Sequence, residues 1–133
     1  MNDRFKFRIW NGSEMHYNDF VVTATGYVGK ITEEFLGKCV FNQEDLTADK
    51  ECTLMQCTGL KDRNDKLIYE GDIVSIDDGE LKGIAQRHNK FDEYYGCIEI
   101  KLICRHLTIY KPTVFAESEI IGNIYENKEL LNE

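Results

Sequence analysis

Residues 54–74 read LMQCTGLKDRNDKLIYEGDIV, and this stretch decides the fold. From Ile68 to Ile76 the residues alternate as in a strand, but the apolar phase slips at Glu70-Gly71-Asp72. A slip of this kind indicates a turn or bulge directly before a buried strand, because one extra residue changes which face the side chains reach. We therefore expect Gly71-Asp72 to turn the chain into a buried strand at 73–76.

The rest of the chain repeats this combination of short strands and turns. Turn-forming residues recur at 11–13, 77–79 and 93–96, and only one proline is present. Runs rich in β-branched and aromatic residues lie between the turns, a spacing typical of antiparallel β proteins. The pattern predicts a mainly β fold with minor α content. Within this fold, residues 54–133 are expected to form a small SH3-like barrel. The tail at 127–131 is predicted to form one helical turn, with Asn127 as its cap.

Residues 1–53 are expected to add a β-hairpin and a short helix. The hairpin combines a strand at 4–10, a turn at Asn11-Gly12 and a return strand at 16–22. The helix is predicted over 32–36, with Thr32 as its N-cap and Gly37 at its end. No linker-like segment separates the two parts, so we expect residues 1–53 to pack on the barrel as one compact unit.

Charge and cysteine content limit the class of protein. The 133-residue chain has a net charge of −8. The negative charge is concentrated in 31–80, which contains 13 acidic and 5 basic residues. Affinity for phosphates comes mainly from cations, so nucleic acid is an unlikely partner. The chain has no apolar run long enough to span a membrane. Five irregularly spaced cysteines and the lack of a signal-like start favour a reduced cytoplasmic protein.

Six polar residues of the opening stretch form a candidate interaction surface: Gln56, Thr58, Asp62, Tyr69, Glu70 and Asp72. The competing interpretation, which we favour, is structural. In this interpretation Asp62 and Asp72 accept backbone N–H bonds, Gly59 and Gly71 take unusual φ angles, and Tyr69 packs.

Metal and catalytic motifs are weak. Cys52, Cys57, Cys97, Cys104 and His106 supply enough ligand types for zinc, but the close cysteine pairs usual in structural zinc sites are missing. Asp62 begins an acidic run that departs from a calcium loop, because Leu67 stands where glycine is required. No motif pairs a nucleophile with a histidine, and no glycine-rich phosphate loop occurs. We predict no catalytic residue, metal or cofactor.

Three segments carry a resemblance to a known family. They are the basic-aromatic start at 4–10, the middle motif at 56–62 with 68–74, and residues 120–127 followed by 129–131. In these segments the chain resembles the YopX-like family of small proteins found in bacteriophages and prophages. Two positions depart from the pattern: Asp65 stands where glycine is frequent, and Lys128 where proline is common. Asp accepts positive φ less readily than glycine, so a tight turn at Asn64-Asp65 is slightly strained.

The resemblance implies a phage or prophage origin and an intracellular location in a bacterial host, but no biochemical activity. Our main functional hypothesis is a non-enzymatic binding or assembly module with an unidentified protein partner or a second copy of itself. The alternative is a nucleic-acid-related regulator, built on Lys82, Arg87, Lys90, Lys101, Arg105 and Lys111. A variant of that alternative is an acidic mimic of DNA built on the carboxylates of 31–80. An enzyme ranks third.

Overall fold

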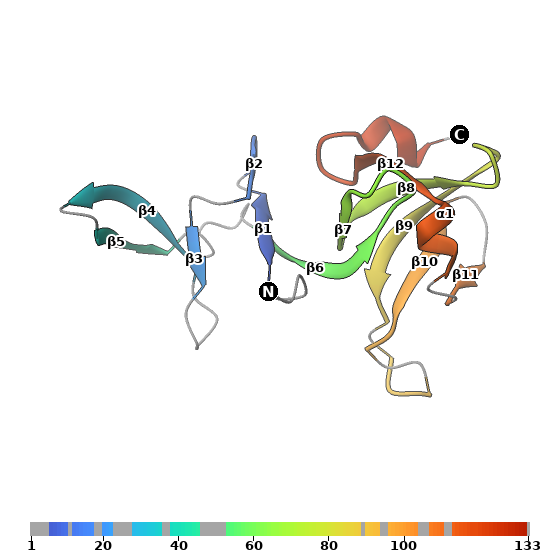
Figure 1. The fold of residues 1–133 in the computed structure, drawn as a ribbon, viewed down its shortest axis with the longest axis horizontal. Coiled ribbons are helices and arrows are strands. Elements are labelled where there is room, and N and C mark those ends of the chain that lie inside the picture. The colour runs from blue at the N-terminus through green and yellow to red at the C-terminus, as the bar shows by residue number, and fades with distance from the viewer. Residues whose placement is uncertain are drawn as a thin grey trace. The chain divides into compact units, whose positions relative to one another are not determined.

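A computed structural model describes residues 6–10, 12–17, 20–22, 28–35, 38–45, 53–88, 90–93, 96–103, 107–110 and 113–132. The chain divides into two compact units (Figure 1). The N-terminal unit is Phe7–Met55, and the C-terminal unit combines Met1–Lys6 with Gln56–Glu133. The predicted packing of 1–53 on 54–133 stays a prediction. The fold is mainly β, as the sequence indicates.

The N-terminal unit contains short antiparallel strands. Strand β1 (Phe7–Trp10) pairs with β2 (Met15–His16), so the chain reverses after Trp10 as predicted. The single return strand predicted over 16–22 is wrong, because the pairing with β1 ends at His16 and residues 20–22 belong to a strand of another sheet. Strands β3 (Phe20–Val22), β4 (Val28–Phe35) and β5 (Lys38–Asp45) form a three-stranded sheet in that order.

The short helix predicted over 32–36 is wrong. These positions belong mostly to β4, and Glu33, Glu34 and Phe35 pair with Val40, Cys39 and Lys38 of β5. The cap signal at Thr32 is local, whereas β-branched and aromatic residues fit a strand once a partner strand is present. Pairing with β5 therefore overrides a weak helix preference.

The C-terminal unit holds the remaining elements. They are β6 (Thr53–Lys61, which starts in the N-terminal unit), β7 (Leu67–Tyr69), β8 (Asp72–Ile76), β9 (Leu81–Arg87), β10 (Ile98–Leu102), β11 (Thr108–Ile109), α1 (Thr113–Glu117), β12 (Glu119–Asn123) and a 3-10 helix (Lys128–Leu131). Five strands form one antiparallel sheet in the order β11-β10-β9-β8-β12, and β6 pairs with β7. The SH3-like topology itself stays a prediction.

The expected turn before a buried strand is confirmed. Gly71 has φ of 90°, and β8 follows it with four of its five residues buried. Strand β8 pairs on one side with β9 and on the other with β12. The phase slip at Glu70-Gly71-Asp72 is thus the turn after which the chain enters an interior strand of the five-stranded sheet.

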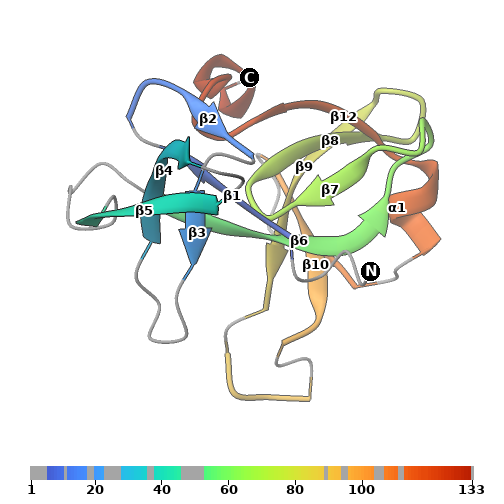
Figure 2. The same ribbon diagram turned by 60° about the vertical axis from the view of Figure 1, so that its left-hand side comes forward.

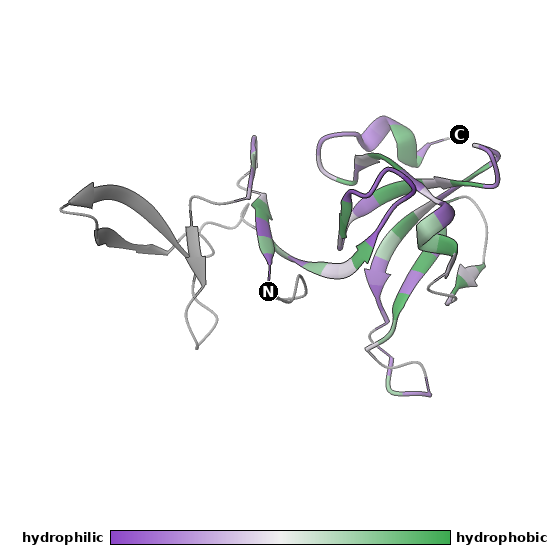
Figure 3. Cartoon of the chain, viewed as in Figure 1, coloured by the Kyte–Doolittle hydropathy of each residue, from purple (hydrophilic) through white to green (hydrophobic). Residues whose placement is uncertain are grey.

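The core of the C-terminal unit lies on the apolar face of this sheet. Its fully or nearly fully buried members are Ile68, Val74, Ile76, Ala85, Ile100, Leu102 and Phe115. Figure 3 shows the apolar residues recurring along β8, β9 and β10. Phe115 comes from α1, an element the sequence analysis did not predict.

Packing around Gly83 is especially close. A Cβ atom at this position of β9 would overlap Cγ2 of Ile100 and lie 3.2 Å from the carbonyl oxygen of Lys101. Because Ile100 is fully buried and β-branched, it has little freedom to move aside. Glycine at 83 therefore permits the close approach of β9 and β10.

The predicted helical turn over 127–131 is present as the 3-10 helix. Asn127 occupies its N-cap position, but its side chain makes no capping bond there and instead accepts the N–H of Asn123 at 3.1 Å. Within the described part of the chain, no helix combines the length and the apolar character that crossing a bilayer requires.

Candidate functional site

The six polar residues predicted as an interaction surface lie mostly inside the fold. Thr58, Asp62, Tyr69 and Asp72 are buried, whereas Gln56 and Glu70 are half-buried. Side chains that contact a partner must be accessible, and four of these six are buried. The role of the six residues in binding therefore stays a prediction. The structure does show what each of the buried groups contacts.

Asp62 organises the turn between β6 and β7. One carboxylate oxygen accepts the N–H groups of Asn64 at 2.9 Å and Lys66 at 3.0 Å. The other accepts the N–H of Ile120, in β12, at 3.0 Å. Asp65 sits in this turn with φ of 66°, as expected for the position where the family often has glycine. The carboxylate thus joins a local turn to a strand 58 residues away.

The same contacts set the pKa of Asp62. Burial acts to raise this pKa, but the N–H groups of Ile120, Lys66 and Asn64 and the positive charge of Lys66 outweigh it. The net effect lowers the pKa of Asp62 below its ordinary value of 3.8. The ionised form is therefore the one that the fold stabilises.

Thr58 and Asp72 act in a similar structural way. The Thr58 hydroxyl donates to the carbonyl oxygen of Ile68 at 2.7 Å, and Asp72 accepts the N–H of Tyr69 at 2.8 Å. Gly59 has φ of 81°. The structural interpretation of the motif, with carboxylates bound to N–H groups and glycines at positive φ, is confirmed.

Strand β12, at one end of the five-stranded sheet, is tied by side chains. The N–H groups of Ile120 and Asn123 donate to the side chains of Asp62 and Asn127. A strand docking onto this edge would need such N–H groups. Their engagement disfavours self-association by strand addition here.

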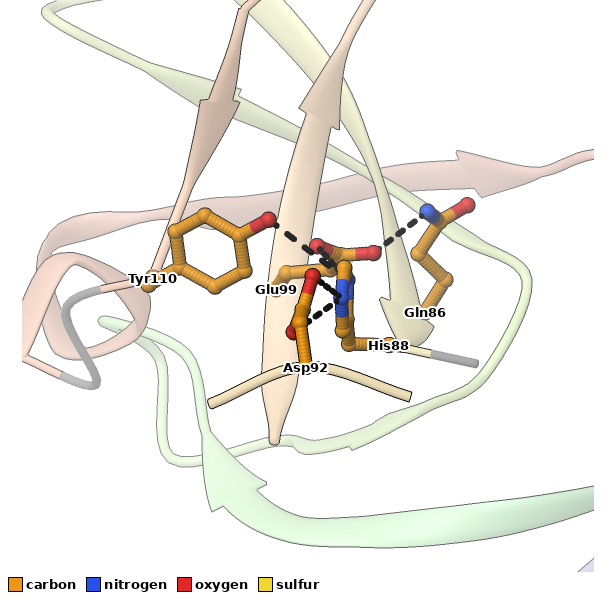
Figure 4. A network of polar contacts seen from close by, with 5 residues as sticks. All are labelled: Gln86, His88, Asp92, Glu99 and Tyr110. Atoms are coloured by element: carbon orange, nitrogen blue, oxygen red, sulfur yellow. Dashed lines mark hydrogen bonds and ion pairs between the residues drawn. The ribbon is translucent and has the colours of Figure 1, made fainter. Parts of the chain in front are cut away.

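A second polar cluster lies where β9 ends and β10 begins (Figure 4). At its centre is His88, whose side chain is 8% exposed. Its Nδ1 lies 3.1 Å from Oε2 of Glu99, and its Nε2 lies 2.9 Å and 3.1 Å from the two carboxylate oxygens of Asp92. The imidazole is thus placed between two carboxylates on opposite sides of its ring.

Neighbouring groups hold this arrangement. Gln86 of β9 donates to Oε1 of Glu99 at 2.8 Å, and the two residues are direct partners in the β9–β10 register. The Tyr110 ring meets the His88 ring edge-on, at 5.6 Å between centroids, and its hydroxyl lies 3.5 Å from Nδ1. The cluster therefore joins β9, β10, the residue after β11 and the segment 90–93.

Both carboxylates act on the pKa of His88. The hydrogen bond with Asp92 is the largest influence and raises it, burial opposes this, and the bond with Glu99 and the two negative charges add to the increase. The net effect raises the pKa of His88 above its ordinary value of 6.5.

This cluster was not predicted from the sequence. His88 precedes Asp92 by four residues and Glu99 by eleven, a spacing that matches none of the motifs considered above. Glu99 alternates with Ile98 and Ile100 like the exposed Lys101, so its position indicates an ordinary solvent-facing side chain of a strand. Its burial against His88 therefore had no signal in the sequence.

The hairpin between β9 and β10 extends away from the other elements of its unit in both views (Figures 1 and 2). Segment 90–93 lies in the connection, and Phe91 within it is 89% exposed. The base of the connection is held by backbone bonds from His88 N–H to Cys97 and from Gly96 N–H to His88, at 2.8 and 2.9 Å. An aromatic side chain is thus presented on an anchored hairpin.

Across the residues that the structure describes, no group of three His, Cys, Asp or Glu side chains is suited to a metal ion. Cys57 is buried and Cys97 exposed. The other potential zinc ligands, Cys52, Cys104 and His106, lie outside the described residues.

Comparisons with known proteins identify a family and a fold. A family model described as "YopX protein" matches residues 6–132. The crystal structure of protein EF1440 from Enterococcus faecalis is similar with a TM-score of 0.58 and 22% identity, covering 96% of this chain and 97% of that one. At this identity the likeness shows the fold alone. No curated protein matches the chain.

Proposed function

We propose that this chain, which belongs to the YopX protein family, is a non-enzymatic binding module encoded by a phage or prophage. In this proposal it works in the cytoplasm of a bacterial host and binds a protein partner through the tip of the β9–β10 hairpin. The observation that carries the proposal is the 89% exposure of Phe91 on that hairpin.

Two physical arguments support the tip as the binding element. Buried aromatic anchors contribute a large share of the energy in protein interfaces, and an 89% exposed phenylalanine offers a large apolar area for burial. Segment 90–93 is also tied through Asp92 to His88, so less conformational entropy is lost when a partner binds it. The complementary partner surface is an apolar pocket in a protein.

Two arguments favour binding over catalysis. The polar groups of the 54–74 motif hold turns, and Asp62 and Asp72 both accept backbone N–H bonds. Each ring nitrogen of His88 faces a carboxylate, so neither is directed at a substrate.

The nucleic-acid alternative receives less support. Of its basic residues, Arg87 contacts Glu70 at 3.4 Å and the carbonyl oxygen of Gly96 at 3.0 Å. Two of the carboxylates in the acidic stretch, Asp62 and Asp72, are buried, which removes them from a surface that imitates phosphates.

Site-specific photo-crosslinking tests the proposal. A photoreactive phenylalanine analogue replaces Phe91 in cells of the host, and a matched variant carries it in place of Leu107, which is 61% exposed and outside the hairpin. We expect one protein adduct of defined mass from position 91 that position 107 does not give. Its yield should fall when an excess of unlabelled wild-type chain competes, and not when the competitor is Phe91→Ala.

Four outcomes would overturn the proposal. No adduct from position 91, or the same adducts from both positions, removes the hairpin tip as the binding element. An adduct with nucleic acid favours the alternative function. An adduct with a second copy of the chain replaces the host partner by self-association.

A further inference from the structure

The hydrogen-bonding groups around His88 define its protonation state. A neutral imidazole has one N–H donor and one bare nitrogen, whereas the imidazolium ion has two donors. In this cluster each ring nitrogen faces a carboxylate oxygen within 3.1 Å, Glu99 on one side and Asp92 on the other. Only the imidazolium donates to both.

Both carboxyl oxygens of Glu99 have a partner. Its Oε1 accepts a hydrogen bond from the Gln86 amide at 2.8 Å, which suits a carboxylate, and its Oε2 faces His88. A neutral imidazole would leave a lone pair opposed to one of the two carboxylates, and Glu99 is nearly fully buried. Losing the proton therefore costs the cluster a charge-assisted hydrogen bond.

The two carboxylates differ in how freely they can leave. Glu99 lies within β10 and is 5% exposed, whereas Asp92 is 48% exposed and lies in segment 90–93. When the imidazolium loses its proton, Asp92 can exchange its bond for water at little cost, and Glu99 cannot. The bond to Asp92 is the one that breaks.

We propose that His88 is a proton-dependent latch, which holds segment 90–93 and its exposed Phe91 in place while the imidazole carries two protons. The latch goes beyond the binding proposal. Only its effect on partner binding rests on that proposal. If the hairpin tip binds a partner, the protonated protein presents a preorganised Phe91 and the deprotonated protein a looser one.

Two further polar side chains of the described residues lie near His88. Tyr110 approaches Nδ1 at 3.5 Å, on the side of Glu99. Arg87, next to His88 in the chain, is directed to Glu70 and to the Gly96 carbonyl. The raised pKa of His88 has the sign that this arrangement requires.

Fluorine NMR of the protein labelled with fluorophenylalanine tests the latch without any partner. The resonance of Phe91 is identified by its loss in Phe91→Leu. Between pH 5.5 and pH 9 we expect this resonance to move between two limiting positions with a midpoint above 6.5, the ordinary value for histidine. His16→Gln, which changes the other described histidine, should leave the curve unchanged.

Two variants separate the latch from other titrations. In His88→Gln the inflection should vanish. In Asp92→Asn, which keeps the buried part of the cluster intact, the midpoint should fall because one negative charge is gone. A wild-type resonance that does not respond to pH, or an inflection that persists in His88→Gln, overturns the latch. Because no partner is present, neither result depends on whether the tip binds one.

Discussion

Two connections in the C-terminal unit are each held by one buried ionisable side chain, but the groups that this side chain bonds with differ in kind. At the turn after β6, Asp62 accepts three backbone N–H groups, none of which titrates. At the end of β9, His88 bonds with Asp92 and Glu99, two side chains that are themselves charged. The first connection depends on a carboxyl group whose pKa is lowered below 3.8, and the second on an imidazole whose pKa is raised above 6.5.

This difference separates a structural role from a functional one. A backbone N–H is always a donor, so the Asp62 turn keeps one geometry at every pH at which the carboxylate is ionised. The His88 cluster needs an added proton to satisfy both carboxylates. The motif that identifies the family therefore maintains the fold, while the hairpin that no motif marks can respond to its surroundings.

The largest expected effect is at the Asp62 turn. Asp62→Ala removes the acceptor of three N–H groups, and we expect the free energy of unfolding to fall by about 3 kcal/mol. Urea denaturation measures it. Glu80→Ala, at an exposed carboxylate in another turn, is the control and should change stability by less than about 0.5 kcal/mol. Equal effects of the two substitutions would remove Asp62 as the organiser of this turn.

The strands that carry the His88 cluster are sensitive to added volume. Gly83→Ala puts a methyl group against Ile100, and we expect a loss of about 2 kcal/mol from overpacking. Gly96→Ala is a matched control for volume, because nothing lies within 4 Å of a Cβ there, although its φ of 81° adds backbone strain. If urea denaturation shows that Gly83→Ala loses less stability than Gly96→Ala, the inferred close approach of β9 and β10 is wrong.

At acid pH the Asp62 turn should weaken. The pKa of Asp62 is lower in the folded chain than its ordinary value of 3.8, so its contribution is present above that value and is lost as the pH falls through the folded pKa. Asp62→Asn keeps an acceptor oxygen but does not titrate. The stability difference between wild type and Asp62→Asn should therefore shrink as the pH falls below about 4. A constant difference down to pH 2 contradicts the assignment.

For His88 the pH dependence of stability has the opposite sign to that for Asp62. The pKa of His88 is higher in the folded chain than 6.5, so its contribution is complete below 6.5 and is lost as the pH rises through the folded pKa. Thermal unfolding at steps from pH 6 to pH 9 should show wild type losing stability that His88→Gln does not lose. Parallel curves for the two proteins would show that the two carboxylates do not hold a proton on His88.

The sequence predicted the elements whose signal is local. Gly71 before a buried strand, the positive φ at Asp65 and the last helical turn are each determined by neighbouring residues. The helix proposed at 32–36 failed because pairing of β4 with β5 is a tertiary effect. Helix α1 was missed because its five residues form little more than one turn, which depends on packing of Phe115.

The contacts of the candidate site also divide into those that are local in sequence and those that depend on the tertiary fold. That Asp62 binds N–H groups in its own turn could be predicted, but its bond to Ile120 could not, because β12 is distant in sequence. The His88 cluster depends on the register of β9 and β10, which places Gln86 opposite Glu99. Nothing in the spacing of His88, Asp92 and Glu99 specifies that register.

The central claim is that the folded chain keeps two protons on the His88 imidazole to higher pH than an ordinary histidine does. Nitrogen NMR of the imidazole rings, with the resonances assigned through His88→Gln, tests it most directly. At pH 6.5 most His88 side chains should be protonated on both ring nitrogens, with a titration midpoint above 6.5. A midpoint at or below 6.5 would contradict the account.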